Sequence, residues 1–556
     1  MTKIHWFRSN VKRNGWISRL TWQVAPLISC VFFLTLLIGF EVNAQTVPDS
    51  ALTTKSTQTP GNEKSNLRLP SVSALNQQGF LQLLVARSAE IKFSQISTEV
   101  TRNLQQAEGA LYESILFSSL RQEGRSRQRT ADERLQNTFT AGTAVLDENG
   151  HTDELGIRSK LPTGAEVSAS YKLTRKSNNI IPQTAAFDTE YNALLNLTLK
   201  QPLLRNLGRE VTETDLRVAE IEHQISLHQL TQQTLKTSIE GLTLYWQLHR
   251  AQESVALRQQ ALSNARNLLA DAEARLAAGK ATASSLLELQ SVLLNRQIEH
   301  ARSQQALREA QSKLGTALDL TTQESMAIVT KPTLRDSTVD VSMVDTERAL
   351  DQWSPYQIAR LKFDQAQARL NFAHNQTKPV ADLVLSYSGT GYDNKSQAAR
   401  SAAEQSAYPE WFLGLNFEFP LQGNRKARQQ YLAQINRLAQ AELDIAAIKN
   451  SFTNDIAVRL DDVITAYKAL MLSYDELTLR QRILDIEEHR AKLGMGSQST
   501  LIQRYADLVE AQQRQLENQV RYELAVATLQ YIKGNLLSEH QIVISIQATR
   551  GLETLR

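Results

Sequence analysis

Two stretches of the chain decide the fold: LNLTLKQPL at Leu195–Leu203 and LGLNFEFPL at Leu413–Leu421. Each stretch alternates apolar and polar residues and ends in Pro-Leu, and the second lies 218 positions after the first. A second pair, ARLAAG at Ala274–Gly279 and AKLGMG at Ala491–Gly496, is separated by 217 positions. Because the two separations agree to within one residue, we interpret the chain as two copies of one unit of just over 200 residues.

Long helices are predicted around these stretches. Glycine and proline number 22 and 12 among 556 residues, about half the usual share, and no proline occurs in 203–331 or 421–556. Each unit is predicted to begin with a helix, at 79–120 and 346–377, and to contain a rod of about 70 residues, at 209–278 and 424–493. Shorter helices at 283–314 and 499–533 return from glycine turns. Apolar residues of the second rod follow the 4,3 spacing of a coiled coil, at Ile456, Leu460, Val463, Tyr467, Leu470, Tyr474 and Leu477.

Four segments alternate with period two and are predicted as β-strands, at 165–174, 195–199, 382–388 and 413–419. A half-buried sheet of a soluble protein shows the same alternation. Strands of about ten residues can also cross a bilayer when tilted. In that case one face meets lipid, at Leu195, Leu197, Leu199, Leu413, Leu415 and Phe417. The other face lines a water-filled lumen, at Asn196, Thr198, Lys200, Asn416 and Glu418.

Four strands cannot close a barrel alone, and an open sheet edge is not tolerated in lipid. Several chains must therefore pool their strands if the sheet spans a membrane. Two chains give eight strands, with an interior filled by side chains, and three give twelve with room for a pore. The pooled helices then continue the barrel as a tube of about 100 Å.

The N-terminus carries the features of an export signal, 1–44, with five basic residues before a 16-residue apolar run at Ala25–Phe40. Cleavage before Gln45 is predicted. An uncleaved anchor, or a lipoprotein modified at Cys30, are the alternatives. The organisation then predicted is a disordered linker (45–74), a first repeat (75–320), a second linker (321–345), a second repeat (346–537) and a C-terminal tail (538–556).

The formal charge of +3 belongs to the leader. Without residues 1–44 the chain holds 56 basic and 57 acidic residues, so the charge predicts no nucleic-acid partner. The single cysteine excludes an internal disulfide, and the scattered histidines predict no metal site. No catalytic constellation or cofactor motif is found, so no enzyme is predicted.

In its order of strand-Pro-Leu junctions, tip motifs and the Leu161-Pro162-Thr163-Gly164 turn, the chain resembles the TolC-like outer-membrane efflux and secretion proteins. The resemblance covers roughly 75–540. It implies a mainly α fold with a β-barrel portion: two tandem repeats of long helical hairpins with two strands each. It also implies a homotrimer with a twelve-stranded outer-membrane barrel and a periplasmic helical tunnel.

The resemblance implies a passive export channel of a tripartite efflux pump or a type I secretion system. Its partners would be a periplasmic adaptor and an inner-membrane pump of the RND or ABC type. The implied adaptor contacts are at the hairpin tips, at Arg275, Leu276, Gly279, Lys492, Leu493, Gly494 and Gly496, although these residues equally suit a plain hairpin turn. A soluble periplasmic coiled-coil adaptor or scaffold is the alternative function. The exported substrate, whether drug, metal ion, protein or polysaccharide, is not predicted.

Two features depart from the family pattern. Some members of the family carry acidic residues just after the second tip that form a constriction. The corresponding stretch here is Leu501–Tyr505 with Asp507 beyond it, and the first tip offers Glu288 instead, so the identity of the gate residues stays open. The segment between the first predicted helix and the last predicted strand is about 50 residues longer in the first repeat than in the second. It contains the charged stretch Arg121–Arg134. A longer helix end and a surface loop are both compatible with it.

Overall fold

A computed structural model describes residues 74–542, apart from 136–139, 141, 186, 280–281, 322–328, 331–345 and 494. The predicted leader, most of both predicted linkers, most of the C-terminal tail and Gly494 therefore lie outside the described residues. The predictions made for them stay predictions.

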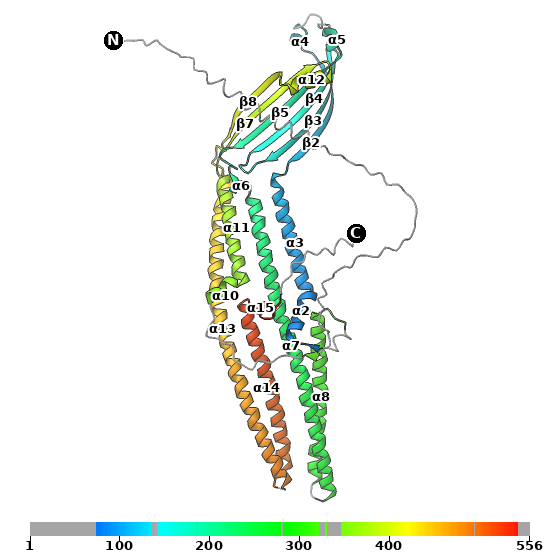
Figure 1. Ribbon diagram of the computed structural model, residues 1–556, viewed down its shortest axis with the longest axis vertical. Helices are drawn as coiled ribbons and strands as arrows, with labels where there is room; N and C mark the ends of the chain where they lie inside the picture. Colours follow the sequence, from blue (N-terminus) through cyan, green and yellow to red (C-terminus); the bar gives the residue numbers. More distant parts are fainter. Residues whose placement is uncertain are drawn as a thin grey trace, which may run out of the picture. The chain divides into compact units, whose positions relative to one another are not determined.

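The two long rods are confirmed (Figure 1). Helix α7 spans Thr214–Ala277 and α13 spans Arg425–Lys492. Their 64 and 68 residues make rods of about 96 and 102 Å at 1.5 Å per residue. Helices α8 (Ala283–Ala317) and α14 (Gln498–Ile532) return alongside them, within a few residues of the predicted bounds.

The helices predicted at 79–120 and 346–377 are each broken in two, so both predictions were wrong in extent. The first becomes α2 (Gln77–Arg87) and α3 (Ala89–Gly109), because Ser88 between them has an extended backbone with ψ of 124°. The second becomes α10 (Thr346–Gln352) and α11 (Ser354–Gln376). Pro355 lies in the first turn of α11, where its missing N–H is tolerated but α10 cannot continue through it.

The sheet holds six strands where four were predicted. In spatial order they are β2 (Ile115–Gln128), β3 (Val145–Lys160), β4 (Glu166–Asn178), β5 (Thr189–Pro202), β7 (Val380–Asp393) and β8 (Tyr408–Glu418). Every neighbouring pair is antiparallel. Repeat one therefore contributes four strands and repeat two contributes two, so two strands for each repeat was wrong, and three copies no longer make twelve.

The two unpredicted strands occupy the longer segment of the first repeat. The charged stretch Arg121–Arg134 is neither a helix end nor a loop over most of its length, because β2 runs to Gln128 and pairs with β3 along all fourteen residues. On β3 charged residues stand at odd positions (Asp147, Asp153) and at even positions (Glu148, Glu154). On β2 the charged residues Arg121–Arg127 alternate with Gln122, Gly124 and Ser126, so neither strand shows the apolar–polar period of the other four. Only the short helix α4 (Ala131–Leu135) at the end of this stretch is helical.

The ends of the sheet differ. At the helix end, β2 and β7 follow α3 and α11, while β5 and β8 lead through turns into α7 (after the short helix α6, Arg209–Thr212) and α13 (Figure 1). The turn Leu161–Ala165 joins β3 to β4 at this end as well. At the loop end, the connections carry the short helices α4, α5 (Ile181–Thr184) and α12 (Ser396–Glu404).

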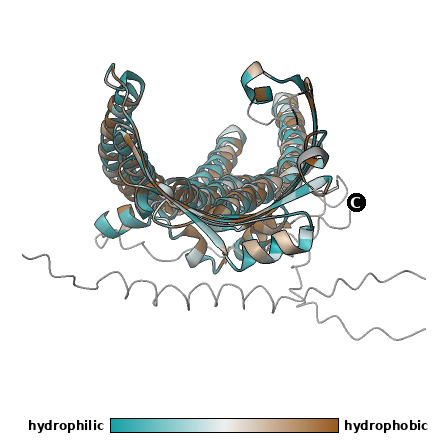
Figure 2. Ribbon diagram, turned by 90° about the horizontal axis from the view of Figure 1, so that it is seen from above, coloured by the Kyte–Doolittle hydropathy of each residue, from teal (hydrophilic) through white to brown (hydrophobic). Residues whose placement is uncertain are grey.

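Next to the sheet, four helices lie side by side in the order α3, α7, α11, α13. Farther from the sheet, α7–α8 and α13–α14 form two hairpins, and α14 packs on α7. Viewed from above, strands and helices follow the same arc (Figure 2). Within the described part of the chain, no helix combines the length and the apolar character that a membrane span requires.

The predicted coiled-coil seam of α13 is a real interface. Ile456, Val463 and Leu470 are buried against Tyr522 and Val526 of α14. Leu460 and Tyr467 border the same cluster, and Leu477 packs on a second cluster nearer the tip, whereas Tyr474 is exposed. The 4,3 spacing thus located the partner-facing side of the rod correctly over most of its length.

A second core forms where α2 crosses α7. Leu84 and Phe80 of α2 are fully buried beside Tyr245 and Trp246. Gly241, the only glycine of α7, lies at this crossing, and a Cβ there would come within 2.3 Å of Leu84. The glycine therefore permits the close approach of the two helices. The remaining described elements are short: β1 (Ala74–Leu75) paired in parallel with β6 (Val329–Thr330), the 3-10 helix η1 (Ala110–Tyr112) and α15 (Leu536–Glu539).

Replacing Leu84 by Ala is expected to destabilise the protein by about 2–5 kcal/mol, because the α2–α7 core would keep a cavity. The matched control is Leu135→Ala, where the same side chain is exposed on α4 and about 0.5 kcal/mol or less is expected. Denaturant unfolding of both variants in detergent measures the difference. Equal midpoints would show that α2 does not anchor the fold.

Candidate functional site: the two-faced sheet and the hairpin tips

The sheet has one apolar and one polar face. A single row of register partners crosses all six strands and is made of Leu116, Ile157, Ala169, Leu197, Tyr387 and Trp411. We call the side that carries this row the apolar face and the opposite side the polar face. The apolar face is not covered by the rest of the described chain near the helix end, since Leu197, Leu413, Leu415 and Phe417 are 49–64% exposed.

The residues predicted to face lipid all lie on the apolar face. Leu195, Leu197 and Leu199 alternate along β5, and Leu413, Leu415 and Phe417 alternate along β8. Strand β7 lies between them and pairs Leu385 with both Leu199 and Leu413. The structure therefore brings the two groups together through one intervening strand. That they contact lipid stays a prediction.

The residues predicted to face a lumen all lie on the polar face. Ser386 donates a hydrogen bond to Asn196 at 2.8 Å, and Asn196 donates one to Thr198 at 3.1 Å. The Lys200 ammonium lies 3.1 Å from the Asp382 carboxylate, whose register partner is Asn416. Glu418 lies on the same face at the end of β8. These side chains thus form one hydrophilic surface, although its exposure to a lumen is not tested.

Helix α12 covers the apolar face near the loop end. Ala399 and Ala403 of α12 are fully buried against Ala193 of β5. Gly389 and Gly391 of β7 make this contact possible, since a Cβ at either would lie 2.4 or 2.0 Å from a backbone carbonyl of α12. The uncovered part of the apolar face is therefore limited to the side nearer the helices. Two glycines two residues apart in an alternating strand are the signal in the sequence that a helix packs there.

The two hairpin tips lie together, and one groove runs between them. Arg275, Lys492 and Gly496, three of the predicted tip residues, line this groove with Asp271 and Glu288. Leu276 is half-buried, and Leu493 is exposed on the last turn before the second tip. Gly494 lies outside the described residues. The structure thus assembles three of the predicted tip residues into one surface that carries charges of both signs.

The glycines of the tips act for different physical reasons. Gly279 has a φ of +71°, the left-handed region that glycine adopts without strain, and a Cβ would meet nothing within 4 Å. At Gly496 a Cβ would lie 2.9 Å from the backbone nitrogen of Ala491. Gly279 is therefore required for backbone conformation, and Gly496 for the close return of the chain past α13.

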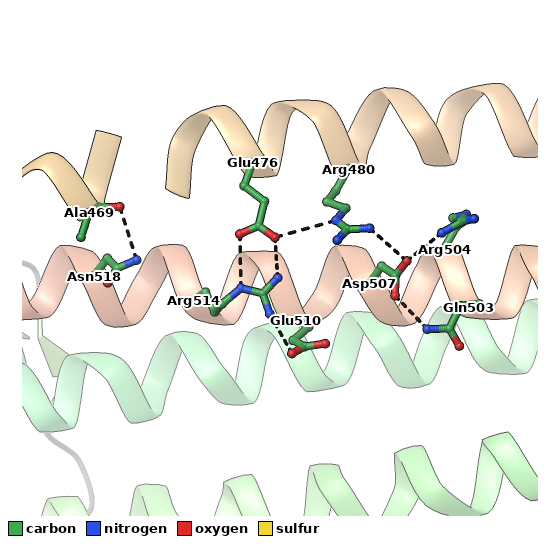
Figure 3. A network of polar contacts seen from close by, with 9 residues as sticks. All are labelled: Ala469, Glu476, Arg480, Gln503, Arg504, Asp507, Glu510, Arg514 and Asn518. Carbon is green, nitrogen blue, oxygen red and sulfur yellow. Dashed lines mark hydrogen bonds and ion pairs between the residues drawn. The ribbon is translucent and has the colours of Figure 1, made fainter. Parts of the chain in front are cut away.

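A network of ion pairs joins the two helices of the second hairpin above its tip (Figure 3). The Arg514 guanidinium donates to both Glu476 oxygens, with Nη2–Oε1 at 2.6 Å and Nε–Oε2 at 3.3 Å. Arg480 of α13 and Arg504 of α14 both approach the Asp507 carboxylate, at 3.3 and 3.0 Å. The hydrogen bonds that Glu476 accepts raise the pKa of Arg514. Such fork-like pairs fix the register of α13 against α14.

Nearer the tip, the Tyr505 hydroxyl donates a 2.5 Å hydrogen bond to Glu488 across the same hairpin. Burial, followed by this hydrogen bond to a carboxylate, raises the pKa of Tyr505, so the phenol stays protonated at neutral pH. In the stretch whose gate role was left open, Arg504, Tyr505 and Asp507 thus take part in the polar contacts of the second hairpin, whereas Leu501 lies in an apolar cluster. The described residues contain no group of three or more His, Cys, Asp or Glu side chains that could hold a metal ion.

The interface between the two hairpins is mainly apolar, in contrast to the polar network within the second hairpin. Leu268 of α7 packs on Leu484, Leu501 and Leu508 of the second hairpin. Ala261 and Ala265 of α7 line a small pocket with Tyr505 and Val509 of α14. The second hairpin is therefore tied within itself by directional contacts and to α7 mainly by side-chain packing.

No known family model matches the sequence, and no curated protein matches it. Solved structures do match in fold. The outer-membrane channel OprN superimposes with a TM-score of 0.59 at 14% identity, over 83% of this chain and 90% of the other. The chain has the fold of the TolC-like outer-membrane channels. The outer membrane protein VceC of Vibrio cholerae (TM-score 0.56, 14% identity, 83% and 96% covered) and the CmeC channel of Campylobacter jejuni (0.59, 11%, 90% and 99%) share it.

Gly391→Ala is expected to displace α12, because the new methyl group would collide with the backbone of that helix. Trypsin should then cleave after Arg400 at least several times faster than in the parent protein, since local opening exposes the bond. The control, Gly124→Ala on β2, places a methyl group 3.4 Å from its nearest neighbour and should leave the rate unchanged. Unchanged cleavage in both variants would contradict the packing of α12 on β7.

Arg514→Ala is expected to loosen the second hairpin, and Arg514→Lys to loosen it less, because lysine cannot donate in a fork. The pair is partly exposed, so a loss of about 1 kcal/mol, or roughly fivefold faster amide exchange in 498–514, is the expected size. Hydrogen exchange read by mass spectrometry measures it, with Arg521→Ala on the same helix as the control. Equal exchange in all variants would mean that the network does not stabilise the hairpin.

Proposed function

We propose that the protein is a passive channel of the Gram-negative outer membrane with a helical extension into the periplasm, and that it works as a homotrimer. The observation that carries this proposal is the uncovered apolar face of the sheet next to helices of about 100 Å. An exposed surface with Leu197, Leu413, Leu415 and Phe417 is unfavourable in water but suits a bilayer.

The open edges of the sheet support closure by further copies. Strands β2 and β8 each have hydrogen-bonding groups without a strand partner on one side, a condition that lipid does not allow. Apolar side chains are also exposed on α3 and α13, which are the two outermost helices of the four-helix layer. They include Phe93, Ile96, Val100 and Leu104 on α3, and Leu432, Ile435, Leu443 and Val458 on α13. Two different edges that complement each other generate a ring when the rotation closes.

The groove between the hairpin tips is the proposed contact for a periplasmic adaptor. It lies at the end of the rods far from the sheet and carries Arg275, Lys492, Asp271 and Glu288. The exposed Leu493 and Met495 beside it add apolar contact area. An adaptor bound there would connect the channel to an inner-membrane pump of the RND or ABC type, for efflux or for type I secretion.

The polar face supports a role as the channel lining. Its serine, threonine, asparagine and paired charged groups, such as Lys200 with Asp382, can be hydrated without leaving a buried charge. A passive channel needs no catalytic group, because the pump supplies the energy. The alternative function, a soluble periplasmic adaptor or scaffold, leaves the apolar face without a partner.

Cysteine labelling separates the two functions. In a Cys30→Ser background, Thr198→Cys should react with a membrane-impermeant maleimide in intact outer membranes. Leu197→Cys, one residue away on the opposite face, should react only with a lipid-soluble maleimide. Sedimentation in mild detergent should give the mass of three chains. A monomer that fractionates as soluble, with Leu197→Cys protected from both reagents, would support the scaffold instead.

A further inference from the structure

The β2–β3 hairpin is an integral part of the sheet and its apolar face. Its outward side chains near the helix end are Leu116, Ser118 and Leu120 on β2 and Leu155 and Ile157 on β3, and Asp153 follows on the same face opposite Leu120. The four aliphatic side chains are 46–77% exposed. Leu116 and Ile157 belong to the register row that continues through β4, β5 and β7 to β8. A hairpin that stood in water beside a four-stranded membrane sheet would have no need of this apolar strip.

The two free edges of the sheet are complementary, and one of them belongs to this hairpin. Strands β4 and β5 are paired on both sides, so β2 and β8 are the free edges of the six-stranded sheet. Strand β2 runs away from the helices and β8 runs back toward them. Strand β8 of one copy can therefore pair in antiparallel fashion with β2 of the next, and the alternation around a closed barrel is preserved.

The width of the sheet agrees with that of the helical layer beneath it. Strands about 4.8 Å apart and tilted by about 40° occupy about 38 Å for six strands and about 25 Å for four. Four helices at about 9 Å spacing occupy about 36 Å. A six-stranded sheet can therefore continue directly into the layer of α3, α7, α11 and α13 without a change of width.

The other side of the hairpin is hydrophilic. Beyond Phe117, the polar face of β2 carries Ser119 and then Arg121, Glu123, Arg125 and Arg127. Glu148 of β3 is the register partner of Arg125, and Glu154 is that of Ser119. Mixed charge of this kind suits a water-filled wall and does not fill an apolar core.

From these observations we infer that β2 and β3 are wall strands, and that the closed outer-membrane barrel holds eighteen strands instead of twelve. The inference rests on the proposed trimer, since three copies of six strands make eighteen. The same geometry gives a backbone diameter of about 36 Å for eighteen strands and about 24 Å for twelve. With side chains subtracted, the exit is about 26 Å wide, which admits bulky hydrated polymers as well as small solutes.

Disulfide trapping between neighbouring copies tests the closure. In the Cys30→Ser background, Leu413→Cys on β8 is combined in turn with Leu116→Cys, Ser118→Cys and Leu120→Cys, all on the apolar face of β2. At least one combination should give a ladder of two and three linked chains on oxidation, because paired strands bring Cα atoms within disulfide range. Phe117→Cys and Ser119→Cys, on the polar face, are the controls and should give none.

The outcome separates the inference from the function on which it rests. A protein with the mass of three chains that forms no β8–β2 cross-link in any combination overturns the eighteen-stranded barrel and leaves the channel standing. A protein without that mass overturns the proposed trimer itself. Cross-links from the polar-face controls as strong as those from the apolar face would also contradict the pairing.

Pore width gives a second, independent reading. In planar bilayers, polymers of graded size added on the barrel side should enter the parent channel up to about 26 Å across. Deletion of residues 115–165 leaves four strands, and the cut-off should fall to about 14 Å. An equal cut-off in both proteins would place the hairpin outside the wall. Should the deletion variant not fold, the disulfide result decides alone.

Discussion

In the proposed membrane setting, every backbone N–H and C=O of the sheet must find a hydrogen-bond partner, and the rest of the architecture depends on this requirement. Within the described chain, the sheet satisfies this requirement internally from β3 to β7 and leaves it unmet along one side of β2 and one side of β8. The apolar face makes a bilayer the suitable environment, and the unpaired edges make a single copy insufficient there. The helical layer likewise leaves apolar side chains exposed on its two outermost helices, α3 and α13.

Stability is distributed along the rods by two kinds of contact. The seam between α13 and α14 combines apolar packing at Ile456, Val463 and Leu470 with ion pairs such as Glu476–Arg514. The seam between the hairpins relies on Leu268 and its neighbours. Directional contacts within the second hairpin fix the register of α13 against α14. Its contact with α7 depends mainly on side-chain packing.

Much of this fold could be predicted from the sequence, because long helices and alternating strands leave strong periodic signals. The rods, their return helices, the turns at Gly279 and Gly496, and the two faces of β5 and β8 were predicted correctly. The hairpin β2–β3 was not, since β3 carries Asp147 and Asp153 on the apolar face and β2 has only Leu116 and Leu120 as large apolar residues there. Nor was α12, which is positioned by tertiary contact with Gly389 and Gly391 and not by its own pattern. The break at Ser88 likewise depends on where α2 packs.

The asymmetry of the two repeats follows from how a sheet can be lengthened. A single added strand would deliver the chain to the wrong end of the sheet, so that β5 could no longer lead back to α7. Two added strands, β2 and β3, return the chain to the same end, where the turn Leu161–Ala165 leads into β4, and every neighbour stays antiparallel. An inserted hairpin is therefore the smallest change that widens the sheet while the helices keep their order. One repeat can accept it alone, because the proposed ring closes between copies and not between repeats.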